Sequence, residues 1–179
     1  MDEPIEPGQW MLEPGQAWDP SLLPSRPDDE ALHSLASSAF WGLDTDTPAW
    51  LDELSRMTAG QRMLISTSTL EGAVNNGGFQ KLWFYWPWAL RPAIDGYRLI
   101  GVERLALLLE TVERTADWSG VWNGDRDAGC PPAEFDRPFY ELATWDTPGA
   151  YPLGQLKNAY MKAHPEQFPR AVRPKRDAW

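Results

Sequence analysis

The sequence predicts an all-α fold, with about six to eight helices packed into one compact domain. Apolar residues recur at helical spacing along most of the chain after residue 28, and no stretch alternates apolar with polar residues as a half-buried strand does. Residues that start and stop helices stand between these segments. With 179 residues, including eleven Trp, six Phe and five Tyr, the chain is long enough to bury one sizeable core.

Residues 1–27 are expected to form an extended, proline-rich arm. Its prolines are Pro4, Pro7, Pro14, Pro20, Pro24 and Pro27, and their spacing excludes a helix of useful length. Within the arm, Glu6-Pro-Gly-Gln-Trp10 recurs imperfectly as Glu13-Pro-Gly-Gln-Ala-Trp18. Two interpretations stay open: Trp10 and Trp18 pack against the body, or they are aromatic anchors for a partner.

The body is expected to cover residues 28–169, and its first three helices have recognisable starts. Asp28 and Asp29 can cap a helix over 28–41, and Thr47-Pro48 combines an N-cap with proline at the first helical position of a helix over 47–57. Thr58 can cap the third helix. Its apolar face consists of Met63, Leu64, Thr67, Leu70 and Val74.

Later helices follow from their apolar stripes. One stripe ends before Pro87 and consists of Phe79, Leu82, Trp83 and Trp86. The clearest stripe consists of Val102, Leu105, Ala106, Leu109, Val112 and Ala116, with Glu110 and Arg114 spaced for an ion pair outside it. Residues 118–133 are expected to form a long loop. Helices resume at 134–145 and at 153–163, the latter with Leu153, Leu156 and Tyr160 on one face.

A polar, glycine-rich turn between two apolar helices is the most distinctive segment. Asn and Gly tolerate the left-handed backbone that reverses a helix end, so a helix should end here and another begin. The motif residues are Glu71, Asn75, Asn76, Gly77, Gly78, Phe79 and Gln80. We interpret their polar members as a cluster that ties the two helices together through bonds to the backbone. A ligand-binding or catalytic turn with Glu71 as a base is the alternative.

Charge is distributed unevenly. Residues 1–60 contain twelve acids but only Arg26 and Arg56, whereas residues 61–179 contain fourteen acids and fourteen bases. The net charge of −10 therefore comes from the first third, and it argues against direct binding of nucleic acid. A short basic tail covers 170–179. The candidate partner-binding acids are Asp28, Asp29, Glu30, Asp44, Asp46, Asp52 and Glu53, unless they only cap helices and complement helix dipoles.

The turn and its surroundings resemble a bacterial family named for its DNA mimic protein. The resemblance rests on Val74-Asn-Asn-Gly-Gly-Phe-Gln80, Leu99-Ile-Gly-Val-Glu-Arg-Leu-Ala106, Glu134-Phe-Asp-Arg-Pro-Phe-Tyr140 and Tyr160–Phe168, and it covers roughly residues 51–168. It implies an all-helical, acidic domain. One type of member is thought to imitate the negative surface of DNA and to occupy a DNA-binding protein.

No pattern predicts a cofactor, a metal site or an enzyme. Asn123, Asp125, Asp127, Gly129 and Glu134 approach the spacing of a calcium loop, but Ala128 replaces its central glycine. His33, His164 and Cys130 fit no metal-ligand spacing, and Cys130 has no base nearby in sequence. The lone cysteine, the absence of a secretory pattern at the start and the shortness of the longest apolar run lead us to expect a cytoplasmic protein without a membrane span.

Three functions compete. We expect a non-catalytic binding protein whose acidic first third engages a basic partner, such as a DNA-binding regulator or a nuclease, as a DNA mimic does. The first alternative is an inhibitor or immunity-type protein that docks through Trp10 and Trp18. The second is a small enzyme or ligand binder at the Asn75–Gly78 turn, and a closed, packed turn would contradict it.

Overall fold

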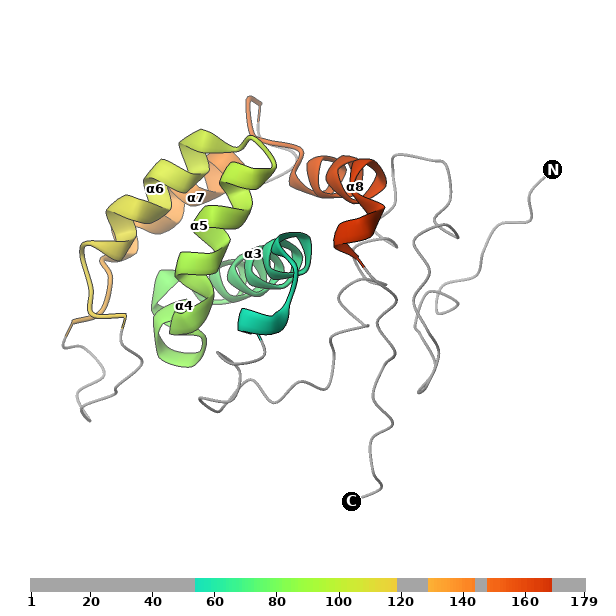
Figure 1. The fold of residues 1–179 in the computed structure, drawn as a ribbon. Helices are drawn as coiled ribbons and strands as arrows, with labels where there is room; N and C mark the ends of the chain where they lie inside the picture. Colours follow the sequence, from blue (N-terminus) through green and yellow to red (C-terminus); the bar gives the residue numbers. More distant parts are fainter. Residues whose placement is uncertain (1–53, 119–128, 144–147, 169–179) are drawn as a thin grey trace, which may run out of the picture.

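The structure is a computed structural model that describes residues 54–118, 129–143 and 148–168. The predicted all-α fold is confirmed, since these residues form α-helices and short 3-10 helices and contain no strand (Figure 1). Residues 54–56 are helical and precede α3. The α-helices are α3 (Ala59–Asn75), α4 (Gly78–Tyr85), α5 (Leu90–Leu99), α6 (Glu103–Glu113), α7 (Asp136–Ala143) and α8 (Leu153–Ala163). The 3-10 helices are η2 (Pro87–Ala89), η3 (Ala133–Phe135) and η4 (Pro165–Gln167).

Helix α3 forms as the sequence predicts. Thr58 accepts a hydrogen bond from the backbone of Gln61, whose side chain accepts one from the Thr58 N–H, so a capping box closes the first turn. The five residues of the expected apolar face are all buried. Gly96 of α5 lies so close to α3 that an added Cβ would stand 3.0 Å from the Cα of Met63. The missing side chain lets the two helices pack backbone to backbone.

Helix α4 ends before Pro87, as expected, but α5 is a helix that the pattern did not predict. Its third residue is Pro92, which reads in the sequence as a second helix breaker. Proline in a first helical turn removes an N–H that has no partner inside the helix, so it is tolerated there. Helix α5 packs on both α3 and α6 and carries the fully buried Tyr97.

Helix α6 buries its predicted stripe. Val102, Leu105, Ala106, Leu109 and Val112 have no exposed surface, whereas Ala116 lies beyond the helix end and is partly exposed. The predicted pair between Glu110 and Arg114 is replaced by another, because Glu110 binds Arg98 of α5 at 2.9 Å. Arg114 instead donates to the Thr111 hydroxyl.

Helices α7 and α8 complete the described body. Figure 1 shows α6 and α7 side by side, with α8 apart from them. Helix α8 begins and ends where predicted, but its buried face differs, since Leu153, Lys157, Asn158 and Met161 are buried. Leu156 and Tyr160 are only partly buried. The reason is the partner of Lys157, described below.

Several expectations lie outside the described residues. They concern the arm, the first helix and most of the second, Asn123 to Asp127 of the calcium-like loop, and the basic tail. Within the described part of the chain, no helix combines the length and apolar character needed to cross a membrane.

Candidate functional site

The turn between α3 and α4 reverses the chain at a glycine. Gly78 has a φ of 70°, whereas no described residue other than glycine has a positive φ. The left-handed position is therefore Gly78, and the asparagines keep an ordinary backbone. Asn76 donates from its side-chain nitrogen to the carbonyl oxygen of Gly72, one turn back in α3, at 2.7 Å. This bond caps α3 and does not reach α4.

Helix α7 binds both ends of this turn. The carboxylate of Asp136 accepts a hydrogen bond from the Phe79 N–H at 2.8 Å, which satisfies a free donor at the start of α4. The hydroxyl of Tyr140 donates to the Val74 carbonyl at the end of α3, at 2.7 Å. Burial raises the pKa of Tyr140, and the charge of Asp136 adds to this, so the phenol stays a donor.

Apolar contacts fill the rest of this junction. The rings of Phe79 and Phe139 meet edge to face, 5.6 Å apart, and both residues are fully buried. A Cβ on Gly78 would stand 2.3 Å from a carboxylate oxygen of Asp136. Helix α7 thus packs against this turn, and the absence of a side chain at Gly78 leaves room for the Asp136 carboxylate.

The polar residues of the motif do not gather into one cluster. Asn75, Asn76 and Gln80 are exposed, whereas Glu71 is partly buried. Glu71 bonds instead to residues of α5 and α8. Its Oε1 accepts from the Tyr97 hydroxyl at 2.8 Å and from the Lys157 ammonium at 2.7 Å.

This Glu71 centre is buried. The side chain of Lys157 has no exposed surface, and that of Glu71 is 19% exposed. Burial lowers the pKa of Lys157, and the negative charge of Glu71 opposes that change. Burial also raises the pKa of Tyr97 well above its usual value, and Glu71 reinforces the rise.

Glu71 stands out in the sequence as part of the turn motif, whereas its partner Lys157 is 86 residues away along the chain and is not part of any predicted site. The sequence nevertheless contains a signal that indicates a buried lysine at this position. Lys157 stands four residues from both Leu153 and Met161, so the helical spacing places it on the buried face of α8. A lysine in that position requires a counter-charge or a route to solvent.

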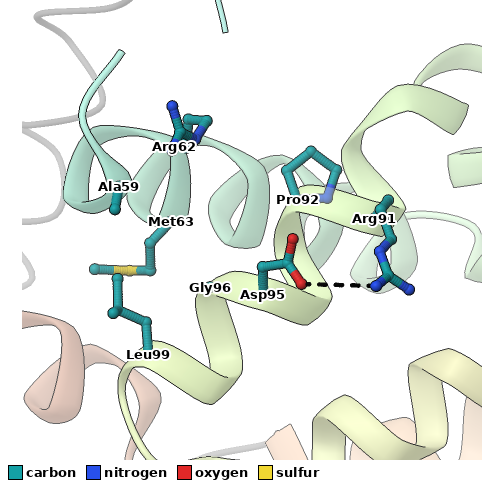
Figure 2. A pocket seen from close by; sticks show the side chains of 8 residues that line it. All are labelled: Ala59, Arg62, Met63, Arg91, Pro92, Asp95, Gly96 and Leu99. Atoms are coloured by element: carbon teal, nitrogen blue, oxygen red, sulfur yellow. Dashed lines mark ion pairs between the residues drawn. The ribbon is translucent and has the colours of Figure 1, made fainter. Parts of the chain in front are cut away.

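The structure contains a cavity elsewhere, between α3 and α5. It measures about 300 Å³ and is lined by Ala59, Arg62, Met63, Arg91, Pro92, Asp95, Gly96 and Leu99 (Figure 2). Its cations already have partners. Arg62 donates to the backbone oxygens of Leu54 and Met57, and Arg91 pairs with Glu113 at 3.2 Å and with Asp95 at 4.0 Å. No motif residue of the turn lines it.

Acids of the described body are largely matched by bases. Arg98 bridges Glu103 and Glu110, and Arg137 pairs with Glu141. With the pairs of Arg91 and Lys157, these contacts leave little unbalanced charge on the helices. Among the described residues, no group of His, Cys, Asp and Glu is arranged to hold a metal ion.

A protein-family model described as DMP19-like protein matches residues 55–171. This chain belongs to the DMP19-like family. The match covers every helix from α3 to η4, so the resemblance that the turn motif indicated is confirmed. No curated protein and no solved structure matches the chain.

The family match starts after the acidic segment of this DMP19-like protein. The predicted partner-binding residues lie before it and outside the described residues: Trp10, Trp18, Asp28, Asp29, Glu30, Asp44, Asp46, Asp52 and Glu53. The shared helical body and the excess of negative charge are therefore separate parts of the chain.

Proposed function

We propose that this DMP19-like protein is a non-catalytic binding protein that presents its acidic first third to a basic protein, in the manner of a DNA mimic. The observation that carries the proposal is the segregation of charge. Residues 1–60 hold all of the net charge of −10, whereas the described acids of the body are mostly paired with Arg or Lys. A segment with net negative charge attracts a cationic partner over a longer range than a segment whose charges cancel.

The packing of the helical body supports a structural role for it, separate from binding by the acidic residues 1–60. Helix α7 packs against the turn motif, and the Glu71 centre is buried. Neither the motif nor this centre contributes a residue to the lining of the cavity between α3 and α5. A packed turn favours a structural role over a catalytic one. A cytoplasmic location belongs to the same proposal, because the partner binds nucleic acid and Cys130 is the only cysteine.

Displacement of proteins from immobilised double-stranded DNA tests the proposal. Host DNA-binding proteins are loaded on DNA-cellulose at low salt, and the full chain is added as the competitor. We expect it to release a defined basic protein, with an effect that falls steeply as salt is raised. Release that does not depend on salt, or no release at all, contradicts the proposal.

A charge-neutral variant makes the test specific. Replacing Asp28, Asp29 and Glu30 by Asn, Asn and Gln should weaken release by roughly tenfold or more, at about 1 kcal/mol per lost charge contact. The matched control replaces three acids of the body, Glu103, Glu113 and Glu141, by Gln. It removes the same charge and should leave release nearly unchanged.

A second candidate function uses aromatic docking, and the repeat around Trp10 and Trp18 favours it. Replacing both residues by Ala would then abolish release while the acid-to-amide variant keeps it. The two outcomes separate an inhibitor-like arm from an acidic mimic.

A further inference from the structure

The segment formed by α8 and η4 is attached to α3 at two separate places. Lys157 contacts Glu71 in the second half of α3, and Gln167 contacts Thr58 and Gly60 at its start. The two contacts are ten residues apart between Lys157 and Gln167, and eleven residues apart between Gly60 and Glu71 of α3. Eleven residues of α-helix span about 16 Å. Residues 153–168 thus form a strap across α3.

The near end of the strap is the Glu71 centre. Lys157 extends a fully buried side chain to Glu71, and Tyr97 of α5 holds the same carboxylate oxygen. The backbones of α3 and α5 approach each other closely along their length, whereas α8 makes no comparably extensive approach to another described α-helix. A long side chain bridges the wider separation, so the ion pair carries much of the attachment at this end.

The far end of the strap closes over the start of α3. The Thr58 hydroxyl donates to the Gln167 carbonyl oxygen, and the Gly60 N–H donates to the Gln167 side chain at 3.4 Å. Phe168 is buried, and a Cβ on Gly60 would stand 2.8 Å from its ring. Glycine at this position makes room for the strap.

We propose that residues 153–168 open and close as one unit over α3 while α3 to α7 stay folded, and that the Lys157–Glu71 pair is the latch. Opening returns both charges to water, which offsets part of the cost of separating them. The apolar side chains that the strap buries are Leu153, Met161 and Phe168, fewer than α3, α5 or α6 each bury. Segments with few buried apolar contacts open below the global free energy of unfolding.

Native-state hydrogen exchange of the full chain, read by mass spectrometry, tests this device. Lys157→Met leaves Glu71 charged beside an apolar side chain. We expect exchange in 153–168 to accelerate by about a hundredfold to a thousandfold, with α5 and α6 unchanged. Lys162→Met, on the exposed side of the same helix, is the matched control and should change nothing.

Rescue identifies the ion pair as the cause. In the double variant Glu71→Gln with Lys157→Met, no charge remains buried, and the introduced glutamine still accepts from the Tyr97 hydroxyl. We expect it to recover at least about tenfold of the lost protection. Equal acceleration of α5, α6 and α8 in Lys157→Met overturns the proposal, as does exchange of α8 only together with α5 and α6 in the unaltered chain.

A milder variant covers the case in which Lys157→Met does not fold. Gln167→Ala removes the side-chain acceptor of the Gly60 N–H at the far end. Exchange in 153–168 should then rise by about three- to tenfold, without a change in α6. Uniform acceleration, or none, counts against a strap that moves as a unit.

Discussion

Helices α7 and α8 both bond to α3, α7 at the turn that leads into α4, but the two attachments differ in their physical basis. Helix α7 packs an aromatic ring against Phe79 and meets the free backbone groups of the turn with Asp136 and Tyr140. Helix α8 reaches Glu71 with one buried lysine. Packing distributes the attachment over many atoms, whereas an ion pair concentrates it in two, so the second contact is the one that a single change can release.

The largest effect is expected on the α7 side. Phe139→Ala removes a fully buried ring, and we expect it to lower the free energy of unfolding by about 3–5 kcal/mol. Urea denaturation measures this loss. A double-mutant cycle with Phe79→Ala should give a coupling of about 0.5–1.5 kcal/mol beyond burial. Strict additivity would show that the edge-to-face contact contributes nothing of its own.

Gly78→Ala should be nearly as damaging. The alanine strains a left-handed backbone and displaces the Asp136 carboxylate from the Phe79 N–H, for a combined loss of about 3 kcal/mol. Gly101→Ala is the matched control, since Gly101 has a φ of 77° but an added Cβ there would meet no atom within 4 Å. It should lose only about 1 kcal/mol of unfolding free energy in the same urea series. Equal losses would mean that Asp136 is not sensitive to the room at Gly78.

Tyr97→Phe weakens the α8 side more gently. It removes one donor to Glu71 and should lower the free energy of unfolding by about 1.5–3 kcal/mol, because the acceptor is charged. Lys157 still holds the same oxygen, so the strap should remain closed.

The same substitution also changes the pH dependence. The folded pKa of Tyr97 is raised above its unfolded value, so its contribution is complete below about pH 10 and is lost as the pH rises further. Above about pH 10 the unaltered chain should lose stability more steeply than Tyr97→Phe. Denaturation at pH 9, 10 and 11 measures the two slopes, and parallel slopes would contradict burial of the phenol.

The smallest effect is expected where α7 faces solvent. Arg137→Ala breaks the Arg137–Glu141 pair, whose side chains are 88% and 55% exposed. We expect a change of less than about 0.5 kcal/mol in thermal or urea unfolding. A larger loss would show that charge, and not only packing, holds α7.

The elements whose signals are local could be predicted from the sequence. Thr58 marks the start of α3, and the stripe from Val102 to Val112 repeats at helical spacing. Helix α5 was missed because Pro92 stands in its first turn, where proline is compatible with a helix. A proline alone does not distinguish the start of a helix from its end.

The contacts at the turn needed the tertiary fold. Glu71 and Gly78 stand out in the sequence, but their partners Lys157 and Asp136 lie 86 and 58 positions further on. Nothing local specifies which helix brings a lysine or an aspartate to them. A charged residue on an otherwise apolar helical face, as at Lys157, is the signal that narrows the search.

The contacts of Gln167 and Phe168 with Gly60 have a consequence for the sequences at both ends of the chain. The acidic sequence ends a few residues before Thr58, and the basic sequence begins just after Phe168. Because Thr58 and Gly60 contact Gln167 and Phe168, both sequences are joined to the helical body near one point. A partner that binds either sequence would therefore lie close to the other one.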